Sequence, residues 1–158
     1  MFNKTNSPQI KTWHKIFFLI FVLSAVGFSV YGSYWPKAQV EIGGQKIKVI
    51  LADTYKHRLQ GWSDKKDMGK YGGMLFVFAE RSQHAMVMRR MNFSLDIVWI
   101  DGRTVVDIAP NLPPDPSLTE AGLQPYPPRA PGTLVLELPA GFAQKYGVKI
   151  GDKITIDK

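Results

Sequence analysis

The longest apolar stretch of the chain lies near its N-terminus, and short alternations of apolar and polar residues follow it. Residues 16–35 carry no charged side chain and are rich in Phe, Ile, Leu and Val. At a rise of about 1.5 Å per residue, this stretch makes a helix of about 30 Å, the thickness of the hydrocarbon core of a bilayer. The pattern predicts a membrane-targeting helix over residues 16–35, followed by a single β-rich domain over residues 38–158.

The two ends of this stretch predict its orientation. Residues 1–15 contain three lysines and no acidic residue, which is typical of a cytoplasmic N-terminus. Tyr34 and Trp35, at the other end, favour the lipid–water interface. Two alternatives stay open. An uncleaved anchor would hold the domain on the outer side of the cell membrane, whereas a signal peptide cleaved near Ala25-Val26-Gly27 would release it as a periplasmic or secreted protein.

Beyond residue 38, the alternations indicate short strands separated by turns. Gly43-Gly44 and Asp101-Gly102 each stand between two alternating runs, which is typical of β-hairpins. Further strands are expected over residues 74–78, 84–88, 134–138 and 153–156, and short helices over residues 55–60 and 139–146. The fold class predicted is mainly β with one or two short helices, as a small closed or sandwiched antiparallel sheet resembling a β-barrel.

One long segment interrupts this pattern. Residues 109–132 hold eight of the eleven prolines and show no periodicity. Proline lacks the N–H that regular elements need, so no helix or strand is expected there. Because a loop of about 24 residues is unusual in a small domain, this loop is a candidate border of a functional site.

Charge and cysteine content narrow the classes of function. The net charge is +7, but the 17 basic and 13 acidic residues from Lys37 onward leave only +4 on the domain. No basic run follows the path of a phosphate backbone, so nucleic acid is not an expected partner. The absence of cysteine excludes disulfides, a cysteine nucleophile, thiolate metal sites and a lipidated cysteine.

Several motifs in a fixed order resemble a known family. They are Ala52-Asp53-Thr54, Arg58, Gly61, Gly73-Met74-Leu75-Phe76-Val77-Phe78, Met88, Leu95-Asp96-Ile97, Asp101-Gly102, Val135-Leu136-Glu137-Leu138-Pro139-Ala140-Gly141, Gly147-Val148 and Gly151-Asp152. Over about residues 40–156 the chain is similar to domain of unknown function 192 of bacteria and archaea. The resemblance implies a compact β-rich fold, often behind an export or membrane segment. It implies no reaction, because the family has no established activity.

The chain departs from that family in one place. Where the family often has Trp-Met-Lys-Asn-Thr, this chain reads Val87-Met88-Arg89-Arg90-Met91. Arg90 and Met91 thus replace the polar Asn and Thr. If those two positions bind a ligand in relatives, the site is altered or lost here.

Asp96 is the first candidate for a binding site, because it stands inside an apolar run. A buried carboxylate must be paired, hydrogen-bonded or protonated. Asp96 could form a ligand-binding cleft together with Arg58 and Arg89. Alternatively, it could accept backbone N–H bonds at the entrance of a strand and serve only the structure.

His84, Met86 and Met88 form a second candidate site. On a strand, these three side chains would share one face, and imidazole and thioether ligands suit Cu(I). Methionine is also a common filler of cores, so packing is the alternative. No other metal site and no cofactor are expected.

The leading hypothesis is a non-enzymatic binding or accessory module outside the cytoplasm, with the membrane and a small ligand or envelope partner as its contacts. It rests on the N-terminal segment and on the absence of a recognisable catalytic motif. Two alternatives remain. One is a small envelope enzyme that uses Asp96 and Arg58, and the other is a copper-handling protein.

Overall fold

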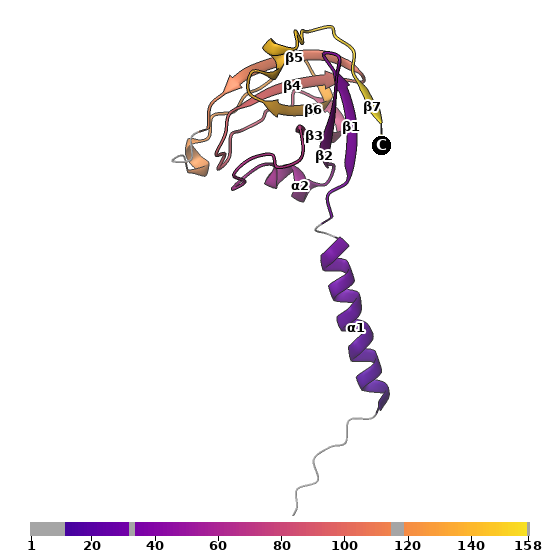
Figure 1. The fold of residues 1–158 in the computed structure, drawn as a ribbon. Coiled ribbons are helices and arrows are strands. Elements are labelled where there is room, and N and C mark those ends of the chain that lie inside the picture. Colours follow the sequence, from indigo (N-terminus) through magenta and orange to yellow (C-terminus); the bar gives the residue numbers. More distant parts are fainter. Residues whose placement is uncertain (1–11, 32–33, 115–118, 158) are drawn as a thin grey trace, which may run out of the picture. The chain divides into compact units, whose positions relative to one another are not determined.

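The computed structural model describes residues 12–31, 34–114 and 119–157. They belong to two compact units, Met1–Tyr34 and Trp35–Lys158. In the first unit, α1 (Thr12–Tyr31) has the length and composition that a membrane span requires (Figure 1). This helix begins four residues before the expected stretch, so Lys15 lies inside it. The other two lysines that predict the orientation of the helix lie outside the described residues.

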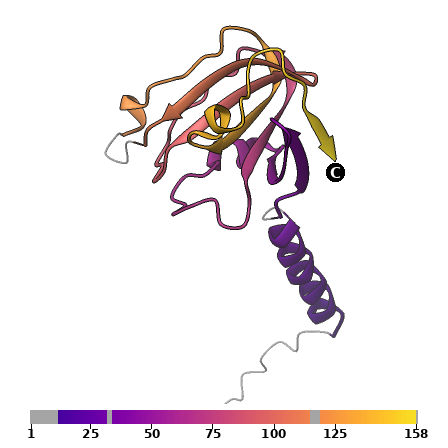
Figure 2. The ribbon, with the colours of Figure 1, turned by 45° about the horizontal axis from the view of Figure 1, so that its top comes forward.

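The second unit is built around one seven-stranded sheet, curled into a half-barrel (Figures 1 and 2). Its order is β5-β4-β6-β3-β2-β1-β7. The bounds are β1 (Lys37–Ile42), β2 (Gln45–Ala52), β3 (Gly73–Ser82), β4 (Leu95–Asp101), β5 (Thr104–Leu112), β6 (Gly132–Pro139) and β7 (Thr155–Asp157). The short helices are α2 (Tyr55–Gln60), α3 (Phe142–Lys145) and the 3-10 turn η1 (Glu120–Gly122). The predicted mainly β class is confirmed.

Both predicted hairpins are present, since β1 pairs with β2 and β4 pairs with β5 in antiparallel fashion. The expectation of a wholly antiparallel sheet is wrong at one pair, because β2 and β3 run parallel. A parallel pair needs a long crossover, and α2 with residues 61–72 provides it. At the far edge, Val105 N donates to Asp152 O at 2.9 Å, which ties β5 to the chain that enters β7.

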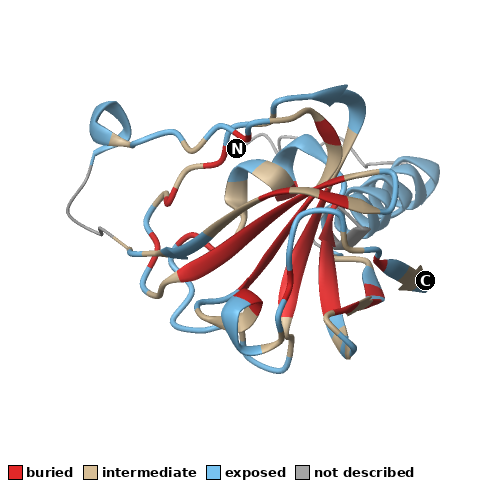
Figure 3. Ribbon diagram, turned by 90° about the horizontal axis from the view of Figure 1, so that it is seen from above, coloured by how far each residue is buried: buried red, intermediate tan, exposed pale blue. Residues whose placement is uncertain are grey.

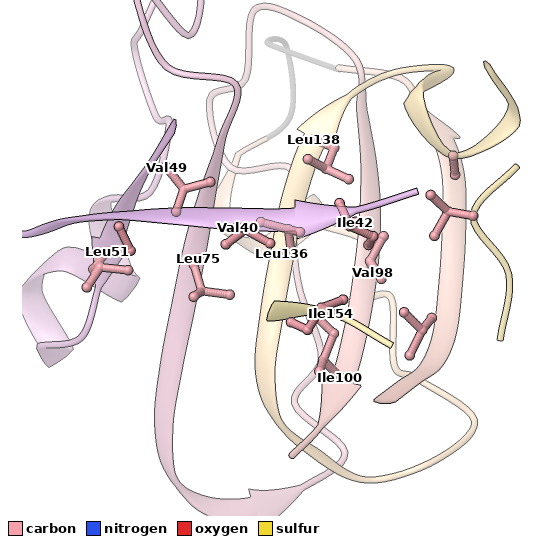
Figure 4. Packing of buried hydrophobic residues seen from close by; sticks show 14 residues of the cluster. Val40, Ile42, Val49, Leu51, Leu75, Val98, Ile100, Leu136, Leu138 and Ile154 are labelled. Atoms are coloured by element: carbon pink, nitrogen blue, oxygen red, sulfur yellow. The ribbon is translucent and has the colours of Figure 1, made fainter. Parts of the chain in front are cut away.

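The sheet separates two apolar clusters because successive side chains of a strand point to opposite faces. The inner cluster lies inside the curl, and Figure 4 shows its packing. It includes Val40, Val49, Leu75, Val98, Ile100, Leu136 and Leu138. The outer cluster lies on the other face and includes Trp62, Met74, Phe76, Met86, Met88, Met91, Ile97, Trp99 and Val135. Buried residues therefore run along both faces of the central strands (Figure 3).

The strand expected over residues 84–88 does not form. Met86 makes one isolated antiparallel bridge to Tyr126, inside the proline-rich segment. Pro128, two residues beyond Tyr126, has no N–H with which to continue the ladder. The carbonyl of His84 instead accepts the indole N–H of Trp99 at 2.8 Å. The proline-rich segment is also more regular than expected, because β5 continues to Leu112 and η1 follows.

Candidate functional site

A cavity of about 530 Å³ lies on the outer face of the sheet, beside α2. Its lining is largely aromatic and aliphatic, with Tyr55, Leu59, Trp62, Phe76, Phe78, Met86 and Met91. The polar side chains of the lining include Arg58, Arg89 and Glu137. The cavity therefore combines an apolar wall with a few polar groups, the composition that is typical of small-molecule sites.

The local sequence explains why α2 stands at this place. The Thr54 hydroxyl accepts the backbone N–H of His57 at 3.1 Å and caps the helix. Gly61, with a φ of 47°, ends it by donating its N–H to the carbonyl of His57. The buried His57 ring stacks on Trp35, with the ring centroids 4.1 Å apart. The helix is thus fixed at both ends and along one side.

Arg58 projects from α2 into the wall of the cavity. Its Nη1 donates to the carbonyl oxygens of Asp53 and Val77, both at 2.9 Å. Its guanidinium also lies 5.3 Å from the centroid of the Phe78 ring, within the range of a cation–π contact. Arg58 therefore fastens α2 to β3, and it also lines the cavity.

Arg89 reaches the cavity from the segment between β3 and β4. Its Nε lies 2.8 and 2.9 Å from the two carboxylate oxygens of Glu120, and its Nη1 donates to Leu59 O at 3.3 Å. These contacts connect the proline-rich segment, through η1, to the end of α2. Arg58 and Arg89, which the sequence proposed for one site, do line one cavity.

Glu137 is the most unusual group in the lining. It lies on β6 opposite Met74 of β3 and Ile97 of β4, and it shares the outer face of the sheet with Val135. Only 5% of the residue is exposed, and its carboxyl group has no hydrogen-bond partner among the described residues. Burial raises the pKa of this carboxyl to about 8, so it is mostly protonated at neutral pH.

A second unpaired polar group belongs to Trp62, whose side chain also lines the cavity. The indole N–H of Trp62 is buried and has no hydrogen-bond partner among the described residues. Its ring packs edge-on against Phe93, with the ring centroids 6.1 Å apart. Buried polar groups are nearly always paired in folded proteins. Because the Trp62 N–H is sealed from the cavity, the unpaired carboxyl of Glu137 is the feature that distinguishes this site.

Asp96 lies elsewhere and has another role. It points to the inner face of the sheet and is fully buried. Its Oδ1 accepts the backbone N–H groups of Asn111 at 2.8 Å and Gly141 at 2.9 Å, and its Oδ2 accepts that of Ala143 at 2.8 Å. Asp96 does not line the cavity with the two arginines. The structure thus shows the alternative role, a carboxylate that holds the backbone near the start of β4.

The predicted copper ligands are not gathered around one cavity. They would share one face of a strand over residues 84–88, and that strand does not form. His84 stacks on Phe78 with ring centroids 3.7 Å apart, and its Nε2 lies 2.8 Å from Glu80 O. Met86 and Met88 are buried in the outer cluster, and of the three only Met86 lines the cavity. The described residues contain no group of three or more His, Asp or Glu side chains placed to hold a metal ion.

Sequence reasoning missed Glu137 and Trp62, although a usable signal was present for Glu137. It stands between Leu136 and Leu138 in an apolar run, the same context that drew attention to Asp96. For Trp62 the sequence offered no comparable signal. Its lack of a partner depends on where the chain places its indole.

Two solved structures resemble this domain. One, a protein of Sinorhizobium meliloti 1021 described as a candidate transcription regulator, is 28% identical, with a TM-score of 0.65 over 77% of this chain and 93% of that chain. The other, a protein of unknown function from Novosphingobium aromaticivorans DSM 12444, is 27% identical, with a TM-score of 0.63 over 77% of this chain and 84% of that chain. The match takes in nearly all of the first solved chain, so that chain forms the shared fold with little sequence besides. A search of curated proteins gave no significant match.

The family comparison agrees with the order of motifs in the sequence. A family model described as DUF192, Uncharacterized ACR, COG1430, matches residues 38–156. This range takes in the cavity, the buried acids Asp96, Asp107 and Glu137, and all of the half-barrel's strands except the first residue of β1 and the last of β7. The chain therefore belongs to the family of domain of unknown function 192.

Proposed function

We propose that residues 35–158 form a binding module that takes up a small organic ligand in the cavity beside α2. The observation that carries this proposal is the carboxyl of Glu137, which lines a largely apolar cavity and has no hydrogen-bond partner among the described residues. An unmade buried hydrogen bond costs about 1–3 kcal/mol. A ligand that pairs with Glu137 recovers this cost, and the fold by itself does not.

The cavity also suits a small molecule in size and lining. Its volume of about 530 Å³ falls within the range of about 300–1,000 Å³ of ligand sites. The exposed Tyr55 and Leu59 and the half-buried Phe78 supply apolar surface for the body of a ligand.

A binding role has more support than a catalytic one. An enzyme needs a second reacting group within reach of its acid or base. Among the described residues, the lining contains neither a histidine nor a second carboxylate beside Glu137. The lining also includes the hydroxyl group of Ser63, but this hydroxyl donates its proton to a backbone carbonyl, Arg89 O at 2.9 Å, and not to a catalytic base. The enzyme hypothesis based on Asp96 and Arg58 has no support from the geometry, because these two residues do not share a cavity.

We also propose that α1 tethers the module to the cell membrane, with the domain outside the cytoplasm. The length and exposed apolar surface of α1 support a membrane span, and the lysines of residues 1–15 support the orientation. Protease treatment of spheroplasts should digest the domain while a cytoplasmic marker stays intact, and N-terminal sequencing should find residues 1–15 retained. Digestion only after lysis would refute the orientation. A new N-terminus near Phe28 would show a released, exported protein instead.

The cavity is tested with the neutral fluorescent probe N-phenyl-1-naphthylamine and the purified domain, residues 35–158. We expect saturable binding with enhanced emission, and at least tenfold weaker binding by Ala85→Trp, because this exposed residue lines the cavity and a large ring fills it. Ala79→Trp is the matched control, since Ala79 is exposed and lies outside the lining. Absence of binding, or equal effects of the two substitutions, would refute the proposed site.

A further inference from the structure

We propose that the ligand presents a neutral amide edge to Glu137, an N–H donor beside a carbonyl acceptor, as in a primary carboxamide or a lactam. This inference rests on the proposed binding function. It adds the chemical class of the ligand's polar group, which follows from the accessibility of the Glu137 carboxyl, its surroundings and its hydrogen-bonding capacity.

The carboxyl group of Glu137 is unpaired, yet it is open to the cavity. Among the described residues, the indole N–H of Trp62 is the one side-chain polar group that is both unpaired and sealed from solvent. Neither carboxyl oxygen of Glu137 has a partner among these residues, so neither oxygen is sealed. Since Glu137 lines the cavity, a ligand there has access to both oxygens.

The surroundings of Glu137 favour the neutral form of its carboxyl. The residues opposite it on the neighbouring strands are the uncharged Met74 and Ile97. The other charged or titratable side chains of the lining are Tyr55 and Arg58 from α2 and Arg89 from the segment before β4. Neither arginine forms an ion pair with Glu137, and burial raises the pKa of the carboxyl to about 8. The carboxyl therefore stays mostly protonated at neutral pH.

The two arginines of the lining already have partners. Nε of Arg89 donates to both carboxylate oxygens of Glu120, which offsets its charge. Arg58 donates to the carbonyl oxygens of Asp53 and Val77, which carry no formal charge. Because Arg58 has no acidic partner among the described residues, its positive charge disfavours a cationic ligand in the cavity.

A neutral carboxyl group has one hydrogen-bond donor and one acceptor side by side. An amide edge supplies the reverse pair, so the two groups form two parallel hydrogen bonds and leave neither oxygen of Glu137 unpaired. A carboxylate ligand offers acceptors only, so it leaves one oxygen of Glu137 without a partner. An amidinium ligand requires ionised Glu137 and also meets the charge of Arg58. The neutral amide is therefore the group that fits best.

The ligand class is tested with three compounds that share a naphthalene ring and differ in the attached group. They are naphthalene-2-carboxamide, naphthalene-2-carboxylate and naphthalene-2-carboxamidine, which are neutral, anionic and cationic. Their affinities for residues 35–158 are measured by displacement of N-phenyl-1-naphthylamine. At pH 7 we expect the carboxamide to bind about tenfold more tightly than either charged compound, because it alone pairs with both oxygens of neutral Glu137.

Two substitutions show whether Glu137 makes this distinction. Glu137→Met removes the donor and the acceptor, so the ratio of carboxamide affinity to N-phenyl-1-naphthylamine affinity should fall about tenfold. Glu80→Met is the matched control and should leave this ratio unchanged, because Glu80 is exposed and lies outside the lining. Equal ratios in the two variants would refute the part assigned to Glu137.

A pH titration tests the neutral form. With a pKa of about 8, neutral Glu137 falls from most of the population at pH 7 to about a tenth at pH 9. If only this form pairs with the amide edge, the apparent affinity for the carboxamide falls about tenfold over this range. Glu137→Gln keeps a donor and an acceptor but does not titrate, so its affinity for the carboxamide should not depend on pH.

The outcomes separate the two proposals. If N-phenyl-1-naphthylamine binds but the three naphthalene compounds bind equally, or do not bind, the binding function stands and the amide class is refuted. Tightest binding of the amidine, with an affinity that rises from pH 7 to pH 9, would refute the amide class in favour of a cation. Tightest binding of the carboxylate would refute it in favour of an anion. If none of the four compounds binds to the folded domain, both proposals are refuted.

Discussion

Asp96 on β4 and Glu137 on β6 lie on neighbouring strands, yet their surroundings are opposite. Asp96 pairs across the strands with Leu138, and Glu137 pairs with Ile97. Paired residues share a face of the sheet, and successive residues of a strand point to opposite faces. Asp96 and Glu137 belong to successive pairs, so Asp96 faces the inside of the curl and Glu137 faces the cavity. Asp96 accepts three backbone N–H groups, whereas the carboxyl of Glu137 has no partner among the described residues.

The difference shows two outcomes of burying an acid in a sheet. At Asp96, N–H groups replace the lost water, and the carboxylate holds the ends of other elements together. At Glu137 nothing replaces the water, so burial raises the pKa of the carboxyl to about 8 and leaves it available to a ligand. The first region contributes stability and the second provides a binding site. Three experiments test this contrast, in order of decreasing expected effect.

The largest effect is expected from Asp96→Ala, which leaves three backbone N–H groups without their acceptor. We expect the free energy of unfolding to fall by about 3–5 kcal/mol, measured by urea denaturation of residues 35–158. Glu41→Ala is the control, since its carboxylate lies 3.9 Å from Lys46 at the surface and contributes little. Asp96→Asn should lose less stability and keep the affinity for N-phenyl-1-naphthylamine. A loss of probe binding without a loss of stability would reverse the roles assigned here.

The second effect is a dependence of stability on pH that Glu137 causes. Between pH 4.5, its ordinary pKa, and pH 8, the folded state keeps a proton that the unfolded chain has lost. The stabilisation is therefore fully present below pH 4.5 and is lost as the pH rises to about 8. From pH 5.5 to 8, we expect wild type to lose about 2–3 kcal/mol relative to Glu137→Gln, measured by urea denaturation at each pH.

Glu137→Gln is itself the control for the other titrating groups, because they are common to both proteins. Among these is the buried Asp107. Burial raises its pKa, but hydrogen bonds from Arg129 and the backbone N–H of Ile108 outweigh this and lower the pKa overall. Its stabilisation is lost as the pH falls, which is the opposite sign. Parallel pH profiles for wild type and Glu137→Gln would show that Glu137 is ionised in the folded state.

The smallest effect concerns Arg90, which lines a second hollow with Arg89 and Glu120. Its φ is 45°, in the left-handed region that asparagine tolerates better than arginine. Backbone geometry therefore accounts for the asparagine that the family often has at this position. We expect Arg90→Asn to raise the free energy of unfolding by about 0.5 kcal/mol, since the exposed pairs with Asp64 and Glu120 contribute little. Arg90→Ala removes the same ion pairs, but alanine tolerates the left-handed region less well than asparagine does. Equal changes in the free energy of unfolding for Arg90→Asn and Arg90→Ala would contradict the explanation.

Much of the fold could be predicted because its signals are local. Alternation and turn residues gave the hairpins at Gly43-Gly44 and Asp101-Gly102 and the bounds of α2. The prediction failed where distant segments decide the structure. Residues 84–88 alternate like a strand, but their neighbour is a proline-rich segment that cannot continue a ladder. The parallel pairing of β2 and β3 likewise depends on how the crossover packs.

The sequence alone determined that an apolar segment precedes one β-rich domain, and that Asp96 required an explanation. Pattern and composition determine these properties, because they depend on neighbouring residues. Only the tertiary structure decided which acid is satisfied and which is free. Asp96 meets N–H groups from positions 111, 141 and 143, whereas Glu137 faces an open volume beside α2. The partners of a buried carboxyl come from distant parts of the chain, so no local pattern separates a structural acid from one that can bind a ligand.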